Sequence, residues 1–100
     1  MDQLPSKSSI REDVDVARFA ADEAADLRRR LRRRTERYNP ERLERIQKVL
    51  PTLEGHGSVL RSHLKRSDHH IGAYGGLRPS IRAVLARLRY ERRQIKKMLT

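Results

Sequence analysis

Apolar residues recur along this chain at spacings of three and four, with polar residues between them, which is the period of an amphipathic helix. The first such stretch extends to about Tyr38 without a proline or glycine. Ser9 and Glu12 have the spacing of a capping box, so we expect this helix to begin at Ser9. Its apolar seam consists of Ala17, Ala20, Ala24, Leu27, Leu31 and Tyr38.

The pair Asn39-Pro40 predicts the start of a second helix, because asparagine favours the N-cap and proline the first helical position. We expect Pro51 to end or kink this helix. Two glycines then predict a turn at 55–57, and Ser58 caps a short helix over 58–67. The apolar residues expected to be buried in these two segments are Leu43, Ile46, Leu50, Val59, Leu60 and Leu64.

Residues 68–76 contain three glycines and are expected to form a loop. The last helix is predicted to begin at Pro79 or Ser80. Only Glu91 interrupts its seam, which Leu85 and Leu99 widen; the seam itself consists of Leu77, Ile81, Val84, Leu88, Ile95 and Met98. No segment has the alternation of a strand. The pattern predicts an all-α fold: a small bundle of three to four helices with long N- and C-terminal amphipathic helices.

A chain of 100 residues forms one domain, and we expect a flexible tail over 1–8 and a single helical domain over 9–100. Only 36% of the residues are apolar and only four are aromatic, so the core of a single copy is small. We therefore expect a homodimer in which a second copy covers the apolar helix faces. The positions expected in the core or the dimer interface are Leu27, Leu31, Ile81, Val84, Leu88 and Ile95.

The composition also bounds location and cofactors. The chain has no cysteine, no apolar run long enough to cross a membrane, and no signal-peptide pattern at its N-terminus. We expect an intracellular protein, cytoplasmic or nuclear and not secreted, that binds no membrane and no cofactor.

Charge changes the picture most. Lysine and arginine number 24 against 13 acidic residues, for a net charge of +11, and 19 of the 24 cations are arginines. Residues 1–27 carry a net charge of −4, whereas residues 28–100 carry +15. A field this positive attracts polyanions, and the guanidinium fork suits phosphate oxygens. Codon bias of a GC-rich genome would explain the ratio of arginine to lysine but not the net charge.

The densest positive charge lies in residues 27–37, which we call the arginine-rich segment. On a helix, like charges at spacings of three and four destabilise by about 0.2–0.5 kcal/mol per pair, so this segment needs packing or an anion to hold it. We expect phosphate binding by Arg28, Arg29, Arg30, Arg32, Arg33, Arg34 and Arg37. A solvated or internally paired face, or an acidic protein or membrane surface as ligand, are the alternatives.

Two further basic groups are expected to extend this surface. One lies on the short helix over 58–67, and the other lies on the last helix, where spacings of seven and four place three arginines near one another. These candidate residues are Arg61, Lys65, Arg66, Arg82, Arg89 and Arg93.

These cations favour duplex RNA over DNA as the partner. The arginine-rich segment lacks the Asn, Gln and Ser that read base edges, which favours recognition by backbone and shape with little sequence specificity. Small helical dimers that bind double-stranded RNA occur among viral silencing suppressors, which is an analogy of architecture alone. Single strands are disfavoured because stacking aromatics are few.

Two other functions stay open. Residues 40–50 and 58–67 are compatible with a helix-turn-helix DNA-binding regulator, although the joining segment is long for that motif. A basic helical adaptor that docks an acidic protein or assembly is the alternative from another class.

The four histidines, His56, His63, His69 and His70, do not have the spacing of a metal site, so we expect loop or surface histidines that contact phosphate when protonated. No nucleophile motif, phosphate-binding loop or carboxylate pair in an apolar setting is present. A metal-free ribonuclease would need His63 or His69 as its base. We expect no enzyme activity, no metal and no small-molecule substrate.

Overall fold

The computed structural model describes residues 6–33, 40–69 and 71–98. These residues are almost entirely helical and contain no strand, which confirms the all-α prediction for this part of the chain. The elements are α1 (Lys7–Arg33), α2 (Pro40–Ser67), α3 (Ile71–Tyr74), the short 3-10 helix η1 (Gly75–Leu77) and α4 (Arg78–Lys97).

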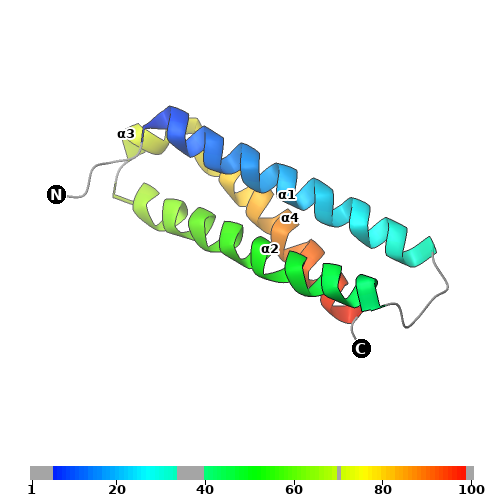
Figure 1. Cartoon of the computed structure of the whole chain (residues 1–100). Helices are drawn as coiled ribbons and strands as arrows, with labels where there is room; N and C mark the ends of the chain where they lie inside the picture. Colours follow the sequence, from blue (N-terminus) through cyan, green and yellow to red (C-terminus); the bar gives the residue numbers. More distant parts are fainter. Residues whose placement is uncertain (1–5, 34–39, 70, 99–100) are drawn as a thin grey trace.

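The three long helices α1, α2 and α4 lie side by side and make a rod of 50 × 24 × 20 Å (Figure 1). Helix α2 runs antiparallel to the other two, and α3 with η1 connects α2 to α4 at one end of the rod. Each long helix packs against both others. Among the described helices, none has an apolar stretch of the length that crosses a membrane.

Helix α1 begins earlier than the capping box predicted. Its cap is Ser6, whose Oγ accepts a hydrogen bond from the Ser9 backbone N–H at 3.1 Å. The predicted cap at Ser9 is therefore three residues too late, because Ser9 lies inside the helix, and residues 7–8 of the predicted tail are helical. The first five residues of that tail lie outside the described ranges. The predicted extension of the helix to Tyr38 falls on residues outside the described ranges.

Helix α2 is one continuous helix, so Pro51 does not end it, and the predicted turn at 55–57 is wrong. Ile46, Leu53, Leu60 and Ser67 are seven residues apart and are all buried. This regular burial runs through the proline and both glycines, which shows that packing against the other helices outweighs their local preference. The two-helix geometry of a helix-turn-helix does not form over 40–67.

Pro51 is tolerated because it lies on the exposed side of α2. Proline removes one backbone donor from the helix, and at the surface water can satisfy the carbonyl that loses its partner. Beside it, the Thr52 hydroxyl donates a hydrogen bond to the Lys48 carbonyl oxygen at 3.2 Å.

The predicted loop over 68–76 is also mostly helical. Only a turn at 68–69 follows α2, and α3 and η1 occupy 71–77. Tyr74 is completely buried and anchors this connection in the core. Gly75 has a φ of +30°, a conformation that other residues rarely adopt, and it allows the chain to turn from α3 into α4.

The core uses the apolar seams of all three helices. All six positions predicted for the core or the dimer interface pack in the core of the single copy, with Leu27 half-buried. They are therefore not free to cover a second copy. The prediction that Val59 is buried is wrong, because it lies on the outer side of α2 and is 43% exposed.

Candidate nucleic-acid interface

The first arginine of the arginine-rich segment pairs with the protein itself. Arg28 Nε and Nη2 donate hydrogen bonds to the two carboxylate oxygens of Glu91 at 2.8 and 3.3 Å. Both side chains are largely buried between α1 and α4, with 13% of Arg28 and 6% of Glu91 exposed. The hydrogen bonds with Glu91 raise the pKa of Arg28, against the opposing effect of burial. Arg28 is therefore engaged by a carboxylate of the protein itself, and this geometry gives no support to its predicted role in binding phosphate.

The other described arginines of this segment point in different directions. Arg29 forms an exposed ion pair with Asp26 at 3.6 Å. Arg30 and Arg32 are exposed and have no ion-pair partner among the described residues. Residues two apart on a helix point in different directions, so these two cations do not converge on one ligand. Arg34, Arg37 and the side chain of Arg33 lie outside what the structure describes.

The interface between α2 and α4 is where unpaired cations come together, and its register is fixed by ion pairs. Two ion pairs cross this interface, Asp68–Arg78 at 3.1 Å and Glu54–Arg92 at 3.3 Å. The two acids are 14 residues apart, Glu54 on α2 and Asp68 directly after its end, and the two arginines are 14 residues apart on α4, so both pairs belong to one antiparallel register. At 1.5 Å per residue, they lie about 21 Å apart along the rod.

Arg61 lies midway between these two pairs. It is seven residues from Glu54 and seven from Asp68, and the same register places it opposite Leu85. An acid therefore stands on either side of Arg61 along α2, but no acid faces it. Arg61 has no ion-pair partner within the described part of the chain.

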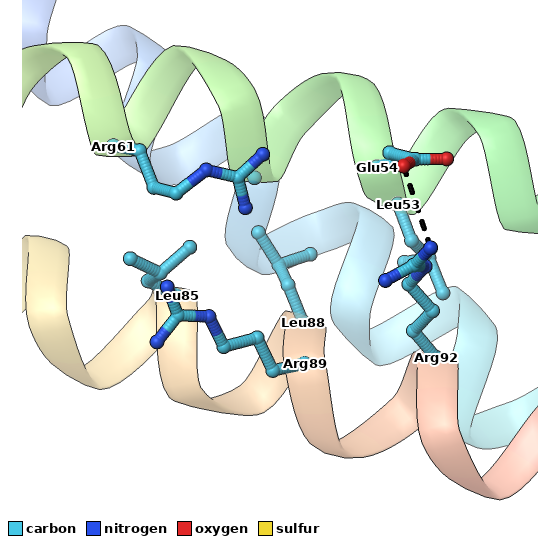
Figure 2. Close-up of a pocket in the computed structure, with 8 residues that line it drawn as sticks. Leu53, Glu54, Arg61, Leu85, Leu88, Arg89 and Arg92 are labelled. Atoms are coloured by element: carbon cyan, nitrogen blue, oxygen red, sulfur yellow. Dashed lines mark hydrogen bonds and ion pairs between the residues drawn. The ribbon is translucent and has the colours of Figure 1, made fainter.

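A small groove lies at this position (Figure 2). Arg61 extends from α2 and Arg89 from α4, and the apolar side chains of Leu85 and Leu88 lie between them in this view. Its volume is about 40 Å³, which has room for a few water molecules. The full lining of this feature, which we call the α2/α4 groove, is Leu53, Glu54, Gly57, Arg61, Leu85, Leu88, Arg89 and Arg92.

Gly57 makes room for the Arg61 side chain. It is buried, and a Cβ added to it would lie 3.3 Å from Arg61 Nη1 and 3.8 Å from Leu85 Cδ1. The guanidinium of Arg61 thus lies back over the glycine, at the edge of the groove (Figure 2).

More cations continue from the groove on both helices. Lys65 is four residues after Arg61 on α2, and Arg82 and Arg93 are seven and four residues from Arg89 on α4, so each shares the side of its helix that borders the groove. All three are exposed, and none has an ion-pair partner among the described residues. Five cations without acidic partners therefore border one groove: Arg61, Lys65, Arg82, Arg89 and Arg93.

The two arginines at the ends of the groove also have an unused donor. In the described part of the chain, the buried Nε atoms of Arg78 and Arg92 have no hydrogen-bond acceptor, although an Nη2 atom of each is paired. A buried donor without an acceptor costs about 1–3 kcal/mol.

The groove lining holds three arginines, apolar residues and one acid, Glu54, but no amide or hydroxyl side chain. Amide side chains read adenine edges, whereas arginine and lysine contact phosphates and can also read guanine edges. The arrangement therefore suits a phosphate backbone more than a base sequence.

His63 has a structural role, so the prediction of a surface histidine that contacts phosphate is wrong for this residue. It is buried between α1, α2 and α3, with Nε2 at 2.8 Å from Asp13 Oδ2 and Nδ1 at 3.2 Å from the Tyr74 hydroxyl. A carboxylate only accepts, so Nε2 donates to Asp13, and Nδ1 of the neutral ring accepts from Tyr74. His63 is thus the hub of a network that joins three helices. His69 is exposed, His56 is half-buried, and His70 is outside the described ranges.

Residue 66, the last predicted binding residue on α2, lies elsewhere. Arg66 follows Arg61 by five residues, which turns it away from the α2/α4 groove toward the side of α2 that borders α1. It is exposed and has no ion-pair partner among the described residues.

Comparison with protein-family models, curated proteins and solved structures finds no match. Within the residues that the structure describes, no three acidic, histidine or cysteine side chains gather as metal ligands would. The assignment of a function therefore depends on the geometry of the groove.

Proposed function

We propose that the chain binds the phosphate backbone of a nucleic-acid duplex along the α2/α4 groove, without catalysis and with little sequence specificity. The observation that carries this proposal is the set of five unpaired cations around the groove. Elsewhere on α4, the outward arginine toward α1 has an acid in reach: Arg87 pairs with Asp22 at 2.7 Å. Charge left unpaired along one groove is what a polyanion requires.

RNA is the favoured duplex. A helix-turn-helix would have placed a reading helix in the DNA major groove, and the continuous α2 removes that motif as a support for DNA. Double-stranded RNA is recognised mostly through its phosphates, its 2′-hydroxyls and its shape. A groove bordered by cations and lacking amide side chains fits that mode.

The test is a binding panel of an RNA duplex, a DNA duplex of the same sequence and both single strands, measured by fluorescence anisotropy at ~150 mM salt. Each phosphate contact contributes roughly −0.9 to the slope of log affinity against log salt on a duplex. If all five groove cations contact phosphates, the slope is about −4 to −5. We expect the RNA duplex to bind most tightly.

Other results would change the assignment. Tighter binding to the DNA duplex would move the proposal to DNA, and equal binding to all four nucleic acids would remove the shape argument. No binding to any of them, together with a saturable complex with an acidic protein, would replace it with the adaptor function.

A further inference from the structure

Three large apolar side chains are exposed on the side of the rod where α1 meets α2. Phe19 is 63% exposed, Val16 is 48% exposed, and Val59 is 43% exposed. The contact between Asp13 and His63 fixes the antiparallel register of the two helices, which brings Val16 and Phe19 level with 55–60 of α2. We call Val16, Phe19 and Val59 the apolar patch.

The patch belongs to a second seam on each helix, outside the core. On α1, residues 12, 16, 19 and 23 repeat at spacings of four and three, and on α2, residues 48, 52, 55, 59, 62 and 66 do the same. Described side chains in both runs are exposed. This is the seam spacing of helices that pack against a further pair of helices.

Gly55 lies in the middle of the α2 seam, one turn before Val59. A Cβ added to it would meet nothing within 4 Å, so the single copy does not need a glycine there. A glycine inside a helix costs roughly 1 kcal/mol relative to alanine. The open space above Gly55 is level with Phe19 and is suited to a bulky side chain from outside.

Charges of opposite sign border the patch on the two helices. On α1 the neighbours along the seam are Glu12 and Glu23, which are exposed and have no partner among the described residues. On α2 they are Arg66, which is also unpaired in the described ranges, and Lys48, whose ion pair with Glu44 is exposed. The acidic rim of α1 and the basic rim of α2 are therefore complementary to each other.

We infer that the apolar patch binds a second copy of this chain, with the two-fold axis along the rod. This arrangement lays α1 of one copy on α2 of the other. It brings Phe19 over Gly55 and Val59 and Glu12 next to Arg66, and it places Glu23 level with Thr52, one turn from Lys48, in each direction. Four helices then enclose both patches.

The charges around the patch distinguish between a two-fold axis along the rod and one across it. A two-fold axis across the rod would instead lay α1 on α1 and bring Glu12 opposite Glu23, where like charges repel. An axis along the rod places opposite charges near each other at both ends of the patch. The interface differs from the homodimer expected from the core seams, and it contains none of the five groove cations, so it is independent of the proposed function.

The experiment is sedimentation equilibrium on protein freed of nucleic acid. For wild type, we expect the mass to rise from 11.7 kDa at low concentration toward twice that value. Phe19→Ser should weaken association at least tenfold, since buried aromatic anchors dominate small interfaces. Gly55→Leu should do the same, whereas Gly72→Leu, at a glycine that is equally open in the single copy, should not. Far-UV circular dichroism should show unchanged helicity for all three variants.

Charge reversal tests the direction of the axis. Glu23→Arg should weaken association because it brings an arginine to the turn of α2 next to Lys48, and the double variant Glu23→Arg/Lys48→Glu should restore it. With the axis across the rod, Glu23→Arg would instead strengthen association by facing Glu12. That result would overturn the arrangement. A wild-type chain that stays monomeric at ~100 µM, where a dimer with a Kd of about 1 µM is almost fully formed, or a dimer unaffected by both Phe19→Ser and Gly55→Leu, would overturn the inference itself.

Discussion

The two interfaces of α4 use arginine in opposite ways. Toward α1, Arg28 and Arg87 are both held by carboxylates of the protein, at 2.8 and 2.7 Å. Toward α2, the carboxylates that pair with arginines of α4 in the described part of the chain lie at the two ends of the interface, on Arg78 and Arg92. In the middle of that interface, Arg61 and Arg89 have no acidic partner among the described residues. One side of the helix is neutralised, and the other is left positive.

This difference shows that the density of arginines along the sequence is a poor guide to where an anion binds. The arginine-rich segment has the highest density, yet its first two members pair with Glu91 and Asp26. The α2/α4 groove collects cations that are far apart in the sequence. The position of the acids decides the location of the positive surface.

The largest effect on stability is expected from removing one partner of the buried ion pair between α1 and α4. Arg28→Met leaves the Glu91 carboxylate buried without its partner, which should lower the free energy of unfolding by about 3 kcal/mol. Urea unfolding measures it. The double variant Arg28→Met/Glu91→Leu removes both charges and should return to within about 1 kcal/mol of wild type. A single variant as stable as wild type would show that the pair does not hold α1 to α4.

A smaller effect is expected from the buried network. Tyr74→Phe deletes the hydroxyl that donates to His63 Nδ1 and should cost about 1–2 kcal/mol, because the ring nitrogen is left without a partner. Thermal and urea unfolding check this value. Duplex affinity should not change, since His63 is inside the protein. A variant that keeps its helicity but loses duplex affinity would indicate that His63 contacts phosphate.

The smallest effect is expected at the floor of the groove. Gly57→Ala should raise the free energy of unfolding by up to ~1 kcal/mol through helix propensity, because the exposed Arg61 side chain can give way to the new methyl group. The displaced guanidinium should reduce duplex affinity slightly. Destabilisation instead would mean that Arg61 is fixed in place and has a structural role.

The helices and most of the core could be predicted from the sequence, because apolar residues at spacings of three and four lie on the buried face of a helix. The continuity of α2 was hidden by Pro51, Gly55 and Gly57, whose local preferences favour a break. The repeat of Ile46, Leu53 and Leu60 at sevens was the signal that packing continues through them.

The site was less accessible to prediction. Arg61 and Arg89 were among the candidates, but so was Arg28, because all arginines look alike until their partners are known. Arg28 and Glu91 are 63 residues apart, and only the register of α1 against α4 brings them together. Glu91 appeared as a gap in an apolar seam, and a buried acid in such a gap requires a cation from a neighbouring helix.

The most direct test of the central claim compares two triple variants with the same change in charge. Arg61→Ala/Arg82→Ala/Arg89→Ala removes three unpaired groove cations, whereas Arg18→Ala/Arg29→Ala/Arg87→Ala removes three cations that pair with acids on the α1 side. The measurement is the slope of log affinity for an RNA duplex against log salt. The groove variant should be less steep than wild type by about 3, at roughly −0.9 for each lost phosphate contact, and the control should stay close to wild type. Equal slopes for the two variants would contradict the account, because net charge and not the groove would then govern binding.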